Sequence, residues 1–269
     1  MFTLPKLRHA QPWHEQLKVR QWVNQFFALG SRKRNYHVTI GNNPHGHLAW
    51  VHAEARRVYI SSSLLPVPPD HVRFDPVDEH RRTELLLKAL LAHEAGHVRF
   101  SGPNPGGKLG ELWNSLEDER IERLMAREFH ELGPAFTFIG DIAAETGRGA
   151  GAWSYTAMEG ALIWRFEHDR FHAHWAPRAE DHDIWHRTVR PLVESAWTLG
   201  TSEGVLAVAG EILEVLRQHQ RSLTPPPAPE PEEQTPPSEQ DPAATEPEDG
   251  QKPEDEPETD SGEDQGQFQ

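Results

Sequence analysis

The chain has 269 residues, of which 36% are hydrophobic, so it can hold one large domain or two small ones, and it contains no cysteine, which excludes disulfides and thiol chemistry. The formal net charge is −15, but residues 224–269, with 15 acidic residues and one lysine, carry −14 of it, which leaves −1 for residues 1–223. Such a near-neutral part lacks the basic signal of nucleic-acid-binding domains, so we expect no nucleic-acid partner.

The hydropathy pattern does not indicate a secreted or membrane protein. The first residues, Met1 to Arg8, lack the apolar core of a signal peptide, and no run of 18 apolar residues occurs. We therefore expect no membrane association and a cytoplasmic location.

The first third of the chain predicts one helix and a small sheet. Apolar residues recur at helical spacing over residues 12–29. The basic residues 31–34 that follow indicate a solvated turn or, alternatively, a contact to an acidic partner or to the acidic tail. Residues 36–40, 48–51 and 57–61 are rich in strand-forming residues and are separated by turn signals, which predicts a small antiparallel sheet.

After a proline-rich segment, an apolar helix is expected to start between Asp78 and Thr83 and to carry the sequence H-E-x-x-H at residues 93–97. Positions four apart lie on one face of a helix, so His93 and His97 can offer two imidazole nitrogens to one metal ion. Glu94, turned by about 100°, lies beside that ion, where it can accept a proton from a water. Zinc suits these ligands, and we expect one zinc ion per chain. The alternative is an ordinary core helix with two histidines near its end.

A second helix, over residues 109–125, offers candidates for a third ligand. It follows a turn rich in glycine and proline, so it can fold back on the first helix. With Trp113 at zero, Glu117 falls near 40° on the apolar stripe, and Asp118 falls near 140°, at about its edge. A carboxylate on an apolar face needs a metal or a cation, so Glu117 is the predicted ligand and Asp118 the alternative. A salt bridge from Glu117 to Arg120 or Arg123 remains open.

These residues carry a resemblance to known metallopeptidases. The H-E-x-x-H motif, followed by N-x-L-E-D-x-R-I-E at residues 114–122, resembles the metallopeptidase-type domain that accompanies von Willebrand factor A domains, and cobaltochelatase-subunit-like proteins. It is also similar to the gluzincin arrangement, in which a glutamate on a following helix is the third zinc ligand. The resemblance covers roughly residues 80–130 and implies His93, His97 and Glu117 as ligands and Glu94 as the general base.

Two further expectations come from this resemblance. Gluzincins carry a second acidic residue one turn after the glutamate ligand, where this chain has Ile121, so Asp118 or Glu122 would orient a ligand instead. In zincin-like folds an edge strand above the active-site helix binds extended peptide by strand addition, and Val58 to Ser61 is the candidate, with a plain packing strand as the alternative.

The rest of residues 1–223 predicts helices at 135–146, 153–175 and 188–220, with a Gly-rich connector or lid at 147–151. His182 and His186 have the i, i+4 spacing of a second metal site without an evident third ligand. The surrounding region contains five histidines, His168, His172, His174, His182 and His186. Any one of them can instead serve the first site as an oxyanion stabiliser. Residues 224–269 are rich in proline and acidic residues and predict a disordered tail.

Together these patterns predict an α+β, mainly helical zincin-like domain at residues 1–223 with a small antiparallel sheet, followed by a disordered acidic tail at 224–269. The expected function is that of a zinc metallopeptidase acting on a protein or peptide substrate. The alternative is a non-catalytic, metal-stabilised module that binds a von Willebrand A-domain protein or an ATPase. The sequence names no substrate-binding residue.

Overall fold

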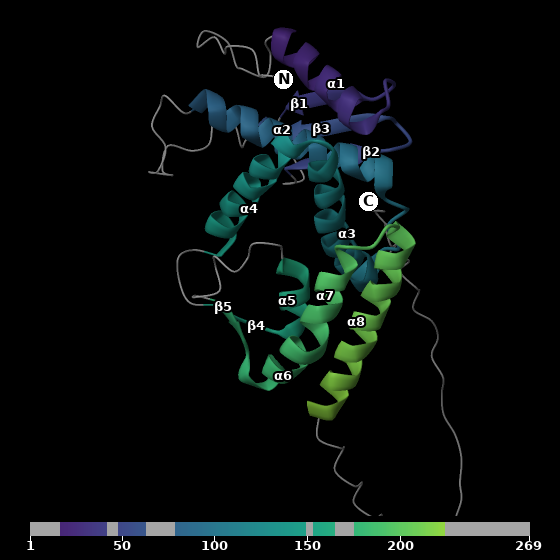
Figure 1. Cartoon of the computed structure of the whole chain (residues 1–269), viewed down its shortest axis with the longest axis vertical. Coiled ribbons are helices and arrows are strands. Elements are labelled where there is room, and N and C mark those ends of the chain that lie inside the picture. The colour runs from purple at the N-terminus through teal and green to yellow at the C-terminus, as the bar shows by residue number, and fades with distance from the viewer. Residues whose placement is uncertain (1–16, 42–47, 63–78, 149–152, 165–174, 224–269) are drawn as a thin grey trace, which may run out of the picture.

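The computed structural model of the chain describes residues 17–41, 48–62, 79–148, 153–164 and 175–223 (Figure 1). The predicted acidic tail, the prolines before the H-E-x-x-H helix, residues 149–151 of the Gly-rich segment and the three histidines at 168, 172 and 174 lie outside the described residues. The described part is mainly helical with a small sheet, as the sequence predicts.

The N-terminal half forms a helix, a three-stranded sheet and two long helices. Its elements are α1 (Leu17–Ser31), β1 (His37–Gly41), β2 (Ala49–His52), β3 (Arg57–Ser61), α2 (Glu79–Phe100), α3 (Gly107–Glu128), the 3-10 turn η4 (His130–Leu132) and α4 (Gly133–Arg148). The predicted start of the H-E-x-x-H helix is confirmed. Thr83, at the later end of the predicted range, lies inside α2 and is buried, while Asp78, at the earlier end, lies outside the described residues.

The C-terminal half is built from shorter helices and one long one. It contains β4 (Trp153–Tyr155), α5 (Ala157–Ile163), β5 (Trp175–Pro177), η6 (Ala179–Asp181), α6 (His182–Ile184), the π-helix η7 (Trp185–Val189), α7 (Arg190–Ala196) and α8 (Ser202–Leu223). The prediction of one helix from 153 to 175 was wrong at both ends, because residues 153–155 and 175–177 pair as a parallel two-stranded sheet. Thr156 then caps α5 with a capping box.

The three-stranded sheet is mixed rather than antiparallel. Its strand order is β1-β3-β2, with β3 parallel to β1 and antiparallel to β2. The prediction that Val58 to Ser61 form an edge strand for a peptide was therefore wrong, since both sides of β3 already carry a neighbouring strand. After β2 the chain returns between the first two strands, so that β3 pairs with both β1 and β2. Strand propensities do not specify this order.

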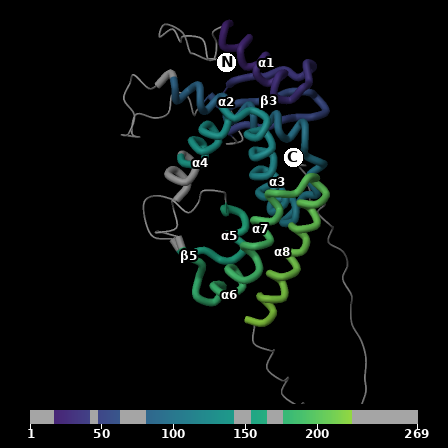
Figure 2. Tube along the Cα trace, viewed as in Figure 1, coloured from purple at the N-terminus to yellow at the C-terminus, as the bar shows by residue number. Residues whose placement is uncertain are grey.

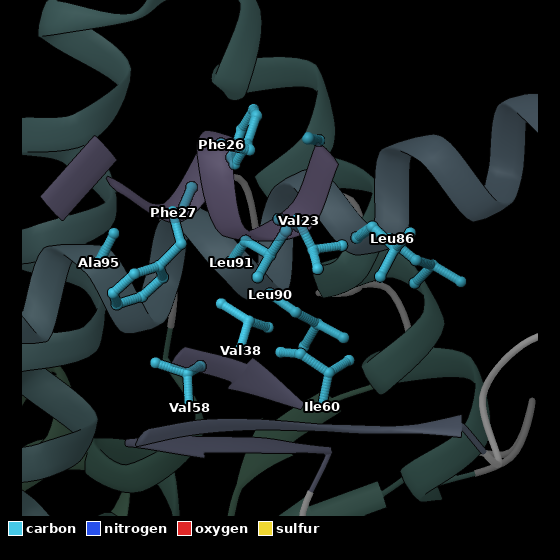
Figure 3. Close-up of a cluster of buried hydrophobic side chains, with 14 of the residues drawn as sticks. Val23, Phe26, Phe27, Val38, Val58, Ile60, Leu86, Leu90, Leu91 and Ala95 are labelled. Carbon is cyan, nitrogen blue, oxygen red and sulfur yellow. The ribbon is translucent and has the colours of Figure 1, made fainter. Parts of the chain in front are cut away.

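The described residues form two hydrophobic clusters, and α3 contributes to both. The first lies between the inner face of the sheet and the helices α1, α2 and α4; Figure 3 shows Val38, Val58 and Ile60 facing side chains of α1 and α2. The second packs the start of α3 against α5, η7, α7 and α8. The two clusters occupy the upper and lower parts of the chain trace, with α3 running between them (Figure 2).

Close contact between α2 and α3 depends on Gly96, which lies inside the H-E-x-x-H motif. A Cβ at this position would come within 3.2 Å of both Cβ and Cδ1 of Ile121 on α3. The turn that returns the chain to α3 also uses glycine, since Gly106 and Gly107 have φ of 75° and 59°. Glycines therefore set how closely these two helices approach.

We expect Gly96→Ala to lower the melting temperature, although alanine favours a helix by roughly 0.5–1 kcal/mol. The Ile121 Cβ is fixed to the backbone, so the helices must separate, and overpacking costs about 1–3 kcal/mol. Thermal unfolding measures the change. Gly210→Ala on α8 is the matched control, because a Cβ there meets no atom within 4 Å and should stabilise the protein. An equal gain in both variants would contradict this account of the helix contact.

Candidate metal centre

Three side chains from two helices converge where α2 crosses α3. His93 and His97 lie one turn apart on α2, and their Nε2 atoms are 3.2 Å from each other. Asp118 on α3 places Oδ1 3.1 Å from Nε2 of His97 and 3.7 Å from Nε2 of His93. Within the described part of the chain, these three residues form the cluster whose ligand atoms lie close enough to share one ion.

The spacing of these three atoms fits a tetrahedral ion. Zinc binds imidazole nitrogen and carboxylate oxygen at about 2.0–2.2 Å, so two ligand atoms at a tetrahedral angle lie roughly 3.3–3.5 Å apart. The three observed separations, 3.1, 3.2 and 3.7 Å, lie on either side of this value. The three side chains are 13–23% exposed, whereas Oδ1 of Asp118 is itself buried.

The outward ring nitrogens of both histidines are held by other side chains. Nδ1 of His93 lies 2.8 Å from Oε1 of Glu122, and Nδ1 of His97 lies 2.9 Å from the hydroxyl of Ser101. Asn114 donates a long hydrogen bond of 3.4 Å to Oδ2 of Asp118. Partners of this kind fix the ring orientation of metal-binding histidines and leave Nε2 for the ion. The expectation that Asp118 or Glu122 orients a ligand fits Glu122, whereas Ser101 was missed because its position just after α2 carries no motif.

The acidic surroundings change the ionisation of His93. Burial alone disfavours the charged ring and lowers its pKa, but Asp118, Glu122 and Glu94 outweigh this effect and raise the pKa to about 9. The metal-free protein therefore holds His93 as an imidazolium at neutral pH. Metal binding needs the neutral ring, so an ion must displace this proton.

We expect the metal-free protein to lose stability as the pH rises from about 6.5 to about 9. The pKa of His93 is raised on folding, so its stabilising contribution is complete below the unfolded value of about 6.5 and is lost through the folded value near 9. Thermal unfolding in the presence of a chelator, measured across this range, tests the prediction. Glu122→Gln should shift the loss to lower pH, and a profile identical to that of the parent would contradict the assignment.

The structure does not bring Glu117 to the histidines, which corrects its assignment as the third ligand. Its side chain is fully buried, and Oε2 accepts a 2.7 Å hydrogen bond from Nε of Arg120. Arg120 also donates from Nη2 to the carbonyl of Phe100, the last residue of α2, at 2.9 Å. Glu117 thus neutralises a buried arginine that ties α3 to the end of α2. The neighbouring Asp118, and not Glu117, lies beside the two histidines.

Glu94 is buried beside the cluster, with 5% of its surface exposed. Its charge acts on His93, since it is among the carboxylates that raise the pKa of that ring. Glu94 is thus a buried carboxylate within electrostatic range of His93 that does not belong to the converging set.

The other histidine pair does not form a comparable site. The rings of His182 and His186 lie 4.6 Å apart, but no third ligand joins them among the described residues. His182 is 61% exposed and contacts Asp183 at 3.4 Å. The predictions for His168, His172 and His174 fall outside the described residues.

Comparisons with protein-family models, with curated proteins and with solved structures found no match to this chain. None of the described helices is both long and apolar enough to cross a membrane.

Proposed function

We propose that the protein is a zinc-dependent metallopeptidase that binds one zinc ion through His93, His97 and Asp118 and uses Glu94 as its general base. The observation that carries this proposal is the convergence of three ligand atoms at 3.1–3.7 Å, from two histidines whose other ring nitrogens are already bonded. Three protein ligands leave a fourth tetrahedral position for water or substrate, as in catalytic zinc sites.

His93, His97 and Asp118 would hold the zinc ion, which would supply a Lewis acid for the carbonyl and would lower the pKa of a bound water to about 7. Glu94 accepts a proton from the attacking water and passes it to the leaving amine. Glu122 and Ser101 hold the two imidazole rings so that their Nε2 atoms keep facing one point. The chain thus has a residue for each proton transfer in amide hydrolysis.

Asp118 and Glu122 also account for a departure from the gluzincin pattern. Counted from Glu117, the acidic residue expected one turn later is replaced by Ile121. Counted from Asp118, the residue one turn later is Glu122, whose carboxylate contacts His93. A shift of one residue therefore supplies both a ligand and a carboxylate that orients a histidine, and this supports the proposed likeness to the gluzincin arrangement.

A second candidate is a metal-stabilised module that binds a von Willebrand A-domain protein or an ATPase without catalysis. It is favoured by the place of the cluster, which joins α2 to α3, the helix shared by the two hydrophobic clusters. An ion there would hold α3 against α2, as structural zinc does in stabilising a fold. Such a module has no need of Glu94, so the role of that residue separates the two candidates.

The first test is the metal content of the purified full chain by elemental mass spectrometry, with His97→Ala as the comparison. We expect about one zinc per chain in the parent and none in the variant. The parent is then assayed against a mixed peptide library by mass spectrometry. Metal without hydrolysis would favour the binding module, and an absence of zinc after zinc has been supplied would overturn both candidates.

A further inference from the structure

The sheet has an outer face that the helices of the first hydrophobic cluster leave open. Strand register places three residues in one row across it and three in the next, while the alternate positions point into the core. The rows are His37–Arg57–His52 and Thr39–Tyr59–Trp50. Four of these six residues are exposed, and Trp50 and Tyr59 are partly exposed. We call these six residues the outer sheet face.

Positive charge gathers along one end of this face. Lys33 and Arg34 precede β1, while Arg56 precedes β3, and these three side chains are exposed. The backbone joins the two segments, since the N–H of His37 donates to the carbonyl of Arg56 at 2.9 Å. Together with Arg57, these residues form a rim of four cations, which we call the basic rim. Among the described residues none of them has an acidic side chain within ion-pair distance, whereas Arg32 beside them is paired with Glu128.

Two arginines at this end stand where the backbone favours glycine. Arg32, just after α1, has φ of 56°, and Arg56, at the end of the β2–β3 turn, has φ of 52°. The left-handed conformation costs a residue with a Cβ roughly 1–2 kcal/mol, and glycine or asparagine usually occupies such positions. Arg32 is paired with Glu128, whereas local folding gives no reason for arginine at position 56, which is consistent with a use for that side chain.

The chain itself contains a suitable anionic partner. Residues 224–269 carry a net charge of −14 over 46 residues, whereas the rest of the chain carries −1. They follow α8, which ends at the opposite pole of the molecule from the sheet (Figure 1). A flexible chain of this length has an r.m.s. span of roughly 35–40 Å and an extended reach of about 150 Å, so it can return to the sheet.

The aromatic residues favour an acidic peptide over a single-stranded nucleic acid. Nucleic acids bind such surfaces by stacking bases on open ring faces. Here the rings of Trp50 and Tyr59 stack on each other, with centroids 4.5 Å apart and planes at 13°, so each ring already covers one face of the other. The cations remain available for carboxylates.

We propose that the acidic segment 224–269 docks on the outer sheet face, with its carboxylates against the basic rim. This contact uses none of the residues of the metal centre, so it does not depend on the proposed function. Opposite charges bring the segment back to the sheet, and the contact is therefore sensitive to salt, because the screening length falls from about 10 Å at 0.1 M to about 3 Å at 1 M.

The test uses the absence of cysteine from the full chain. Ser261→Cys allows a single nitroxide label in the acidic segment, and paramagnetic broadening of amide signals reports what it approaches. We expect broadening centred on residues 33–39 and 50–57 at low salt, and a loss of most of it at 1 M salt. The rim variant Lys33→Ser/Arg34→Ser/Arg56→Asn/Arg57→Ser should reduce this broadening several-fold, as should neutralisation of the four acidic residues at 254–256 and 258.

A matched control removes four exposed cations elsewhere, with Lys18→Ser, Arg20→Ser, Arg187→Ser and Arg217→Ser. This control should leave the broadening as in the parent. Equal effects of the two four-site variants, or broadening confined to the end of α8, would overturn the proposal. If an oligothymidylate shifts the same amides while the label broadens none of them, the face binds nucleic acid and the proposal is wrong. Should the rim variant fail to fold, the salt series and the variant at 254–258 still decide.

Discussion

Glu94→Gln should bind zinc as the parent does and lose peptide hydrolysis by about 10²–10⁴-fold, the usual contribution of a general acid–base group. Glutamine keeps the size of the side chain and its place beside the cluster but accepts no proton at neutral pH. The ligand atoms belong to His93, His97 and Asp118, so the metal content should remain at one ion per chain. Elemental mass spectrometry and initial rates on the same preparation give both quantities.

Glu111→Gln is the control for this variant, because Glu111 is exposed near the start of α3 and the substitution removes the same charge. It should leave both metal content and rate unchanged. Parent-like hydrolysis by Glu94→Gln would rule out the proposed proton transfer. Loss of zinc from this variant would show that Glu94 belongs to the ligand set.

Asp118→Asn should weaken zinc binding by more than the roughly 10–100-fold that the loss of an outer-shell partner costs, whereas Glu117→Gln should leave zinc affinity nearly unchanged. Both substitutions remove one negative charge and preserve side-chain shape at adjacent positions. Only Asp118 places a carboxylate oxygen near Nε2 of both histidines. Competition against a chromogenic zinc chelator measures the two affinities.

In stability the order of the two variants should be the opposite, with Glu117→Gln the more affected. Glu117→Gln leaves the guanidinium of Arg120 buried without its counter-charge, and breaking a buried pair costs about 3–5 kcal/mol. For a domain of this size, that corresponds to a fall of roughly 6–20 °C in melting temperature. Asp118→Asn should lower the melting temperature of the chelator-treated protein far less.

The two variants together test the choice between adjacent carboxylates. Zinc lost from Glu117→Gln but kept by Asp118→Asn would restore the original prediction and contradict the geometry of α3. If both variants bind zinc like the parent, the third ligand comes from neither residue, and the proposed site is wrong.

The sequence alone determined the features that depend on local spacing. Hydrophobic periodicity located α1, α2, α3 and α4 and the three strands of the mixed sheet, because these patterns repeat within one element. The i, i+4 spacing of His93 and His97 required that both rings lie on one side of α2, and their Nε2 atoms do meet. Arg120 was foreseen as an alternative partner of Glu117 for the same reason, since it lies three residues further on.

Only the tertiary structure decided which carboxylate faces the histidines. The stripe used to orient α3 combined Trp113 and Leu116, which belong to the second hydrophobic cluster, with Ile121, which lies against Gly96 of α2. A helix packed on two sides has no single apolar face, so the angular distribution of its apolar residues does not predict which residues face α2. The position of β3 in the sheet likewise depends on where the chain returns, a long-range choice that local propensity does not encode.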